Sequence, residues 1–195
     1  MPIARPAKFA HVVYRTRRFA EMMHWYETVF GARIQHQNPV MAFLTYDDEH
    51  HRFALVDMSA LMPGAAQDVR DDVTGIDHVA YTYATLVDLF ENYAMLKEKG
   101  IKPYWCIHHG VTISMYYADP DGNQMEFQVD CFANSEDASR YMNTKFAANP
   151  VGVEYDPDDW LSRLRAGRPE ADFWARETDE PISPIRGTFA QILAS

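Results

Sequence analysis

The chain contains an internal repeat, and this repeat constrains the fold more than any other feature. KFAHVVYRT, residues 8–16, precedes FAEMMHWYETVFGARI, and DHVAYTYA, residues 77–84, precedes LVDLFENYAMLKEKGIKP. Each copy predicts a strand with His-Val near its start and an amphipathic helix that ends at a glycine, Gly31 or Gly100. Three further β-rich runs follow each helix. We therefore predict an α+β fold with two βαβββ modules in tandem.

The repeat also sets the expected domain boundaries. The modules cover about residues 8–58 and 76–132, within one domain at residues 1–132. The β-pattern then stops, and residues 133–195 are expected to form a helical extension. Within it, Asp156 as N-cap, Pro157 at the first helical position and Gly167 as the stop predict a helix at about residues 157–166.

Composition narrows the class of partner. The net charge of −10 argues against nucleic acids and anionic membranes as partners. The chain has no run of about 20 apolar residues, which a membrane helix requires, and its start has no apolar signal core. The cysteines, Cys106 and Cys131, form no metal-type or redox-type pair. We expect a cytoplasmic protein with a small-molecule partner.

The stretch HHGVTISMYYADPDGNQMEF, residues 108–127, predicts a β-hairpin. Its turn, DPDG, has Pro at the second position and Gly at the fourth, which is typical of a type I turn. In the flanking strands polar and apolar residues alternate, so each strand has a polar row that includes Tyr116 or Glu126. This polar row could face solvent or line a functional cavity.

Two histidines favour the functional interpretation. His11 and His78 occupy the same position in the two repeats, so they are expected at equivalent places in space. Strand alternation puts both, together with Glu126, on the faces that the helices leave uncovered. Two imidazoles and one carboxylate form the ligand set of non-haem Fe(II) oxygenases, although Mn(II), Zn(II) and Ni(II) fit the same ligands. We predict a metal cleft in a curved mixed sheet.

In each of two pairs of adjacent histidines, only one member is expected to face the cleft. In EHHRFALVD, neighbouring residues point to opposite faces, and the alternation predicts that His51 rather than His50 turns inward. The same choice arises between His108 and His109, where the glycine that follows leaves it open. A histidine near a metal but outside its ligand shell is suited to proton transfer near neutral pH.

The two modules with these residues resemble the vicinal oxygen chelate superfamily. HGVTISMYYADPDGNQMEF, residues 109–127, is similar to the signature of type I extradiol ring-cleaving dioxygenases, and HHRFALV resembles the strand with their distal catalytic histidine. The resemblance covers about residues 8–130. The common enzymes of that family carry four modules, so this chain resembles the single-domain members with two.

This resemblance implies a function and a role for each residue. It implies an Fe(II) enzyme, with Mn(II) as the alternative metal, that uses O2 to cleave the ring of a catechol, such as an aryl or bicyclic 2,3-diol, beside the diol. A homo-oligomer, dimer or larger, is also expected. The implied metal ligands are His11, His78 and Glu126; the catalytic residues are His51, His109 and Tyr116; the substrate-binding residues are Val13, Phe43, His109 and Tyr116.

Two other functions fit the same fold. A metal-dependent isomerase or lyase of the glyoxalase type usually employs a fourth protein ligand, for which the sequence offers no firm candidate. A metal-free small-molecule binding protein of the bleomycin-resistance type need not keep the ligand triad, and here all three residues are present. The additional His51, His109 and Tyr116 are most readily explained by the dioxygenase.

Overall fold

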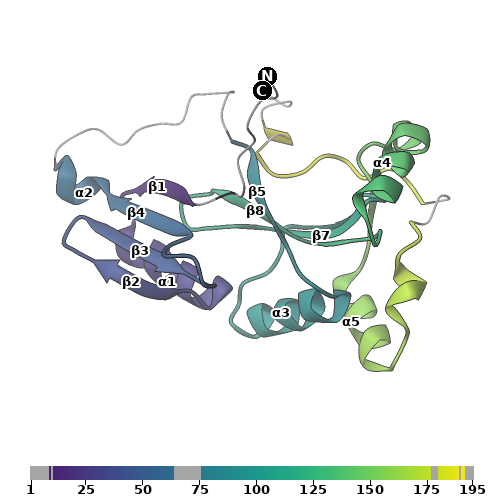
Figure 1. Ribbon diagram of the computed structural model, residues 1–195, viewed down its shortest axis with the longest axis horizontal. Coiled ribbons are helices and arrows are strands. Elements are labelled where there is room, and N and C mark those ends of the chain that lie inside the picture. The colour runs from purple at the N-terminus through teal and green to yellow at the C-terminus, as the bar shows by residue number, and fades with distance from the viewer. Residues whose placement is uncertain (1–8, 10, 64–75, 177–179, 189, 192–195) are drawn as a thin grey trace, which may run out of the picture. The chain divides into compact units, whose positions relative to one another are not determined.

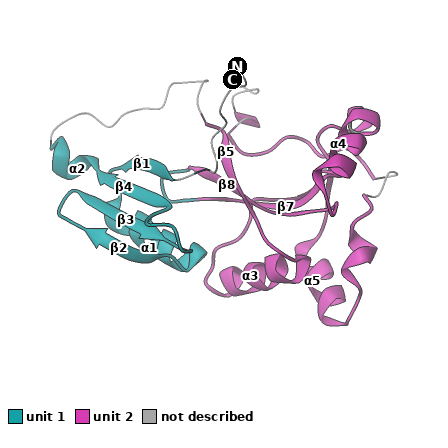
Figure 2. Cartoon of the chain, viewed as in Figure 1, with its two compact units in different colours: residues 1–71, 119–122 teal, residues 72–118, 123–195 magenta. Residues whose placement is uncertain are grey.

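The structure is a computed structural model that describes residues 9, 11–63, 76–176, 180–188 and 190–191. Residues 64–75, most of the segment that joins the two repeats, lie outside the described residues. The chain divides into two compact units, Met1–Asp71 with Asp119–Gly122, and Asp72–Ala118 with Asn123–Ser195 (Figure 2). Each unit contains one copy of the repeat.

The first unit forms a four-stranded sheet in the order β1-β4-β3-β2 (Figure 1). Strands β1 and β4 are parallel, whereas β3 is antiparallel to both β4 and β2. Its elements are β1 (Val12–Thr16), α1 (Phe19–Phe30), β2 (Arg33–Gln37), β3 (Met41–Thr45), β4 (Phe53–Asp57) and the short α2 (Met58–Leu61).

The second unit repeats this topology and adds one strand. Its sheet has the order β5-β8-β7-β6-β9, and its first four strands correspond in order to those of the first unit. The predicted tandem βαβββ architecture is therefore confirmed. The elements are β5 (His78–Thr82), α3 (Leu86–Glu98), β6 (Trp105–His108), β7 (Thr112–Ala118), β8 (Gln124–Asp130), α4 (Ser135–Thr144), β9 (Val153–Glu154), α5 (Pro157–Arg165) and two short 3-10 helices at Phe146–Ala148 and Glu170–Phe173.

Helix α1 packs its apolar face on the first sheet. The rings of Tyr26 and Phe53 have centroids 4.5 Å apart, and Met22 on α1 and Leu55 on β4 are fully buried. The helix ends at Gly31, whose φ of 59° lies in the left-handed region that favours glycine. Burial of this apolar face provides the main stabilisation of a helix of this length.

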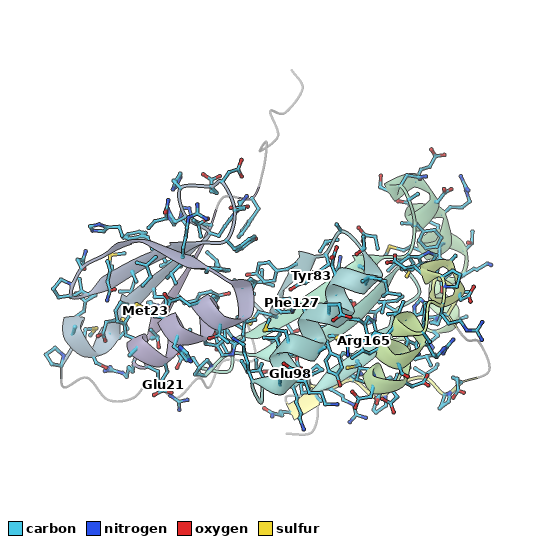
Figure 3. The ribbon with its side chains drawn as sticks, turned by 90° about the horizontal axis from the view of Figure 1, so that it is seen from below. Glu21, Met23, Tyr83, Glu98, Phe127 and Arg165 are labelled. Carbon is cyan, nitrogen blue, oxygen red and sulfur yellow. The ribbon has the colours of Figure 1, made fainter. Side chains whose placement is uncertain are left out.

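Helix α3 has the same role in the second unit. It contacts β8. Both elements bury apolar side chains, which are Leu89 and Phe90 on the helix and Met125 and Phe127 on the strand. Phe127 also contacts Tyr83, with ring centroids 5.7 Å apart (Figure 3). A bond from the amide of Gly122 to the carbonyl of Asp119 closes the hairpin turn, as the sequence predicts.

The C-terminal extension is part of the second unit. Strand β9 pairs with β6 in antiparallel register, which adds the fifth strand to the sheet. Helix α5 begins at the N-cap Asp156, lies beside α3 (Figure 1) and stacks Trp160 on Tyr155 with centroids 4.2 Å apart. None of the helices in the described ranges is long and apolar enough to cross a membrane.

Candidate active site

The polar row of the hairpin is buried. Ser114 is 0 % exposed, and Tyr116 and Glu126 are each 6 % exposed. Tyr116 on β7 is paired directly with Glu126 on β8, and Ala80 on β5 is the parallel partner of Glu126. Because buried polar groups are costly unless they have partners, the bonds within this row determine what it can do.

His78 and Glu126 meet in this row. Nε2 of His78 lies 3.2 Å from Oε2 of Glu126, and Nδ1 lies 2.7 Å from Oδ2 of Asp77. A carboxylate only accepts hydrogen bonds, so Nδ1 carries a proton and Nε2 is directed at Glu126. The bond to Glu126 raises the pKa of His78 to about 9, against the opposing effect of burial.

The second oxygen of Glu126 is also held. Ser114 donates its hydroxyl to Oε1 at 2.6 Å, and Nε2 of His109 lies 3.8 Å from the same oxygen. Burial alone would raise the pKa of Glu126, but the hydrogen bonds from His78 and Ser114 outweigh it, and the pKa lies below its usual value. Glu126 is therefore an ionised carboxylate at neutral pH.

These donors fit a divalent metal ion. The Nε2 nitrogen of His78 and the carboxylate of Glu126 face each other, and a cation between them would replace the proton that now joins them. Asp77 has the place of an outer partner that orients a metal-binding histidine. His11 belongs to the first unit. Across the described ranges, no three His, Cys, Asp or Glu side chains form a group that could hold a metal ion.

His109 is the histidine of its pair that joins the polar row. Its Nε2 lies 3.1 Å from the hydroxyl of Tyr116, and its Nδ1 bonds to the carbonyl oxygen of Val151. Since a carbonyl only accepts, Nδ1 carries the proton, and Nε2 of the neutral ring accepts from Tyr116. Burial lowers the pKa of His109 and raises that of Tyr116, so both groups are neutral near pH 7.

His108 points the other way, because successive side chains of a strand alternate between faces. It is 3 % exposed, accepts a bond from the amide of Gly110 at Nδ1, and donates from Nε2 to the carbonyl of Phe173 at 3.2 Å. Burial lowers its pKa to about 4. These contacts place His108 away from the polar row, where it anchors the extension.

In the first unit, His51 lies against His11 and Phe43. The ring centroids are 4.3 Å apart for His11 and His51, and 5.1 Å apart for Phe43 and His51. The side chain of His50 is 70 % exposed. Val13 is half exposed on β1. Burial, followed by the charge of His11, lowers the pKa of His51.

The prediction that His51 turns inward relies on the alternation of side chains along β4, but His51 lies before this strand. Phe53 packs on α1, and by register it shares its face with Leu44, so Phe43 lies on the opposite face. His51 contacts Phe43 because it precedes β4, in a loop that an ion pair between Arg52 and Asp47 holds at 2.9 Å.

Sequence reasoning missed several residues that hold this site. Asp77 and Ser114 had a usable signal, because one precedes His78 and the other shares a strand face with Tyr116. Val151 had none, since only the fold brings the extension to His109.

Comparison with known proteins gives one family. The model of the Glyoxalase/Bleomycin resistance protein/Dioxygenase superfamily matches residues 8–127. The chain is 44% identical over 176 residues to biphenyl-2,3-diol 1,2-dioxygenase 2 of Rhodococcus globerulus, a match that covers 88% of this chain and 90% of the relative. It is 39% identical over 179 residues to biphenyl-2,3-diol 1,2-dioxygenase 3 of the same organism, covering 89% and 92%.

Solved structures show the same fold at low sequence identity. Lactoylglutathione lyase from Agrobacterium tumefaciens matches with a TM-score of 0.50 at 16% identity, over 65% of this chain and 96% of that chain. A glyoxalase/bleomycin resistance protein/dioxygenase from Nocardioides matches with a TM-score of 0.51 at 17% identity, over 66% and 86%. At such identities the likeness concerns the fold alone.

Proposed function

Because this chain belongs to the Glyoxalase/Bleomycin resistance protein/Dioxygenase superfamily, we propose that it is an extradiol ring-cleaving dioxygenase. Two relatives, 44% and 39% identical over most of the chain, are biphenyl-2,3-diol 1,2-dioxygenases, which supports this activity and an aryl-bearing 2,3-diol as substrate. The observation that carries the proposal is the contact of Tyr116 with His109 beside the His78–Glu126 pair.

The proposed metal ligands are His78 and Glu126 in the second unit and His11 in the first. The donor set supports this assignment, since Nε2 of His78 and a carboxylate oxygen of Glu126 already face each other. The proposed metal is Fe(II), with Mn(II) as the alternative. When bound, the ion supplies a path for electrons between the deprotonated diol and O2.

The protein's own residues move and hold protons. Nε2 of His109 is an unprotonated nitrogen in a buried row, so it can accept a proton from a diol hydroxyl, directly or through the hydroxyl of Tyr116. Burial keeps the hydroxyl of Tyr116 protonated. Because its hydrogen is donated to His109, the oxygen of Tyr116 is left to accept a hydrogen bond from a hydroxyl of the substrate, which orients the substrate and links it to His109.

His51 is proposed as a second acid–base group. Its lowered pKa makes it a neutral imidazole near pH 7, which can accept and return a proton during turnover. Phe43, in edge-to-face contact with its ring, and Val13 are proposed to line the aromatic part of the substrate site.

The test is anaerobic reconstitution with Fe(II), followed by O2 and a panel of diols. Biphenyl-2,3-diol, catechol and a bicyclic 2,3-diol should each be compared with resorcinol, whose hydroxyls are not adjacent. We expect O2 uptake and a yellow ring-fission product with vicinal diols alone. A protein that retains iron but consumes no O2 with any vicinal diol would contradict the proposal.

Loading a parallel sample with Mn(II) tests which metal the enzyme uses. The metal that it uses should give the higher turnover per bound ion. The expected homo-oligomer, dimer or larger, is tested by light scattering on the same preparation.

A further inference from the structure

We propose that the C-terminal extension positions His109, and that Arg176 and Asn149 are the positioning residues through which it acts. This inference rests on the proposed function, in which His109 is a proton acceptor. The extension would hold the His109 ring in the tautomer that leaves Nε2 unprotonated. It would thus contribute to the chemistry without contacting the substrate.

His109 is bonded to Val151 through its Nδ1 nitrogen. The carbonyl oxygen of Val151 has no proton to give, so Nδ1 of His109 must be the donor. In a neutral imidazole this leaves the lone pair at Nε2, the nitrogen that faces the hydroxyl of Tyr116 at 3.1 Å. The carbonyl of Val151 therefore selects the tautomer.

Val151 is in turn held by Asn149 and Arg176. The side-chain oxygen of Asn149 accepts bonds from the amides of Val151 at 3.2 Å and Gly152 at 2.7 Å, which shapes the turn that presents the carbonyl. Nη1 of Arg176 donates to the carbonyl of Asn149 at 2.8 Å and to that of His109 at 3.0 Å. One guanidinium nitrogen of Arg176 thus connects the turn at Asn149 to the backbone of His109.

Close packing leaves the turn no room to shift. Gly152 has a φ of 128°, and a Cβ on it would lie 2.6 Å from the carbonyl oxygen of His108. A Cβ on Gly110 would collide with the hydroxyl of Tyr141 on α4. At both glycines the extension is in close contact with the segment around His109: Gly152 packs on His108, and Tyr141 packs on Gly110.

The bonds around the metal-binding pair do not depend on this arrangement. His78 is held by Asp77, and Glu126 by Ser114, and neither partner belongs to the extension. Loss of the Arg176 contacts should therefore free the His109 ring while His78 and Glu126 stay in place. A misplaced or wrongly protonated acceptor should reduce kcat by roughly 10²-fold, with little change in bound metal.

The experiment compares Arg176→Ala, Asn149→Ala and the conservative Arg176→Lys with the parent chain. Arg168→Ala is the matched control, because Arg168 lies in the same extension and pairs with Asp172 on its surface. The full-length, metal-free proteins are labelled with 15N-histidine, and the nitrogen shifts of His109 report which ring nitrogen carries the proton. Metal-loaded proteins give kcat, KM and metal content.

We expect a protonated Nδ1 in the parent and in Arg168→Ala, and a shift toward protonated Nε2 in Arg176→Ala and Asn149→Ala. The same two variants should lose kcat roughly 10²-fold at constant KM and metal content, and Arg176→Lys should recover part of the loss. An unchanged His109 tautomer in both alanine variants would overturn the proposal. So would a loss of kcat that follows the folded fraction measured by circular dichroism.

These outcomes separate the inference from the proposed function. If the parent chain has the Nδ1-protonated ring, and the variants lose it, the positioning is supported even if no diol is cleaved. If the parent cleaves diols but the tautomer does not respond to either variant, the dioxygenase proposal survives and the positioning does not.

Discussion

Nε2 of His78 lies 3.2 Å from Oε2 of Glu126, while the opposite nitrogen of the same ring bonds to Asp77 at 2.7 Å. The parallel pairing of β5 with β8 produces this contact, because Ala80 is the register partner of Glu126 and His78 begins the same strand. Each end of the imidazole thus has a carboxylate, and the inner carboxylate is buried. This arrangement suits a cation that replaces the bridging proton.

Replacing His78 with Ala should abolish metal retention. The remaining carboxylate of Glu126 would lack the nitrogen donor that faces it, so the variant should return to background metal content after gel filtration. Elemental analysis measures the effect, and His24→Ala, on the exposed side of α1, is the control. Metal content equal to that of the parent would refute the ligand assignment.

Replacing Ser114 with Ala should weaken metal binding without removing it. The variant loses the 2.6 Å bond that orients Oε1 of Glu126, and loss of such an outer partner costs roughly 10- to 100-fold in metal affinity. A lost bond to a buried carboxylate should also lower the free energy of unfolding by about 2 kcal/mol. Competition with a chelator and urea unfolding measure the two effects. Ser139→Ala, on the exposed surface of α4, should change neither.

Replacing Tyr116 with Phe should reduce turnover and leave the metal in place. The ring keeps its edge-to-face contact with His78, at a centroid distance of 5.3 Å, but the hydroxyl that bonds to His109 is gone. Loss of one acid–base or orienting group should cost roughly 10²-fold in kcat. Tyr93→Phe removes a hydroxyl that bonds to Asp158 instead, so it is the control. Equal turnover by Tyr116→Phe and the parent would remove Tyr116 from the proposed mechanism.

The pair His50 and His51 allows a direct comparison. His51→Phe should lower kcat by roughly 10²- to 10⁴-fold, because His51 is the member of the pair that contacts His11 and Phe43. His50→Phe should have a much smaller effect, since the His50 side chain is 70 % exposed. Steady-state kinetics at equal metal content distinguishes the two, and a larger loss for His50→Phe would reverse the assignment.

His108 should make the fold sensitive to mild acid. Its pKa falls from an ordinary value of 6.5 to about 4 on folding, so the unfolded chain binds the proton more readily. The His108 contribution to stability is complete above pH 6.5 and is lost as the pH falls toward 4. Over this window it amounts to at most about 3 kcal/mol.

The variant His108→Gln tests this pH dependence. The side-chain amide of the glutamine can donate a hydrogen bond to the carbonyl of Phe173, but it does not titrate. Urea unfolding at a series of pH values should show a smaller loss of stability in the variant than in the parent chain. Parallel curves for the two proteins would show that His108 does not titrate on unfolding.

The order of helices and strands follows from local signals. The His-Val strands, the amphipathic helices and the left-handed glycine at Gly31 are determined by interactions between residues close in sequence, and the duplication predicts that both sheets share one strand order. The same alternation correctly places Tyr116 and Glu126 on one face of the hairpin. The capping residues of α5, Asp156 and Pro157, are likewise readable without tertiary information.

Tertiary structure determines which histidine of each adjacent pair lies beside other candidate site residues. His108 and His109 are neighbours in sequence, and their bonds to Phe173 and Val151 distinguish the histidine that anchors the extension from the proposed proton acceptor. His51 lies in the loop before β4, so the alternation of side chains along that strand does not determine its direction. It contacts His11 instead. Such choices depend on contacts between residues far apart in the chain. Local periodicity carries no information about them, so the protonated nitrogen of His109 could not be predicted from the sequence that contains it.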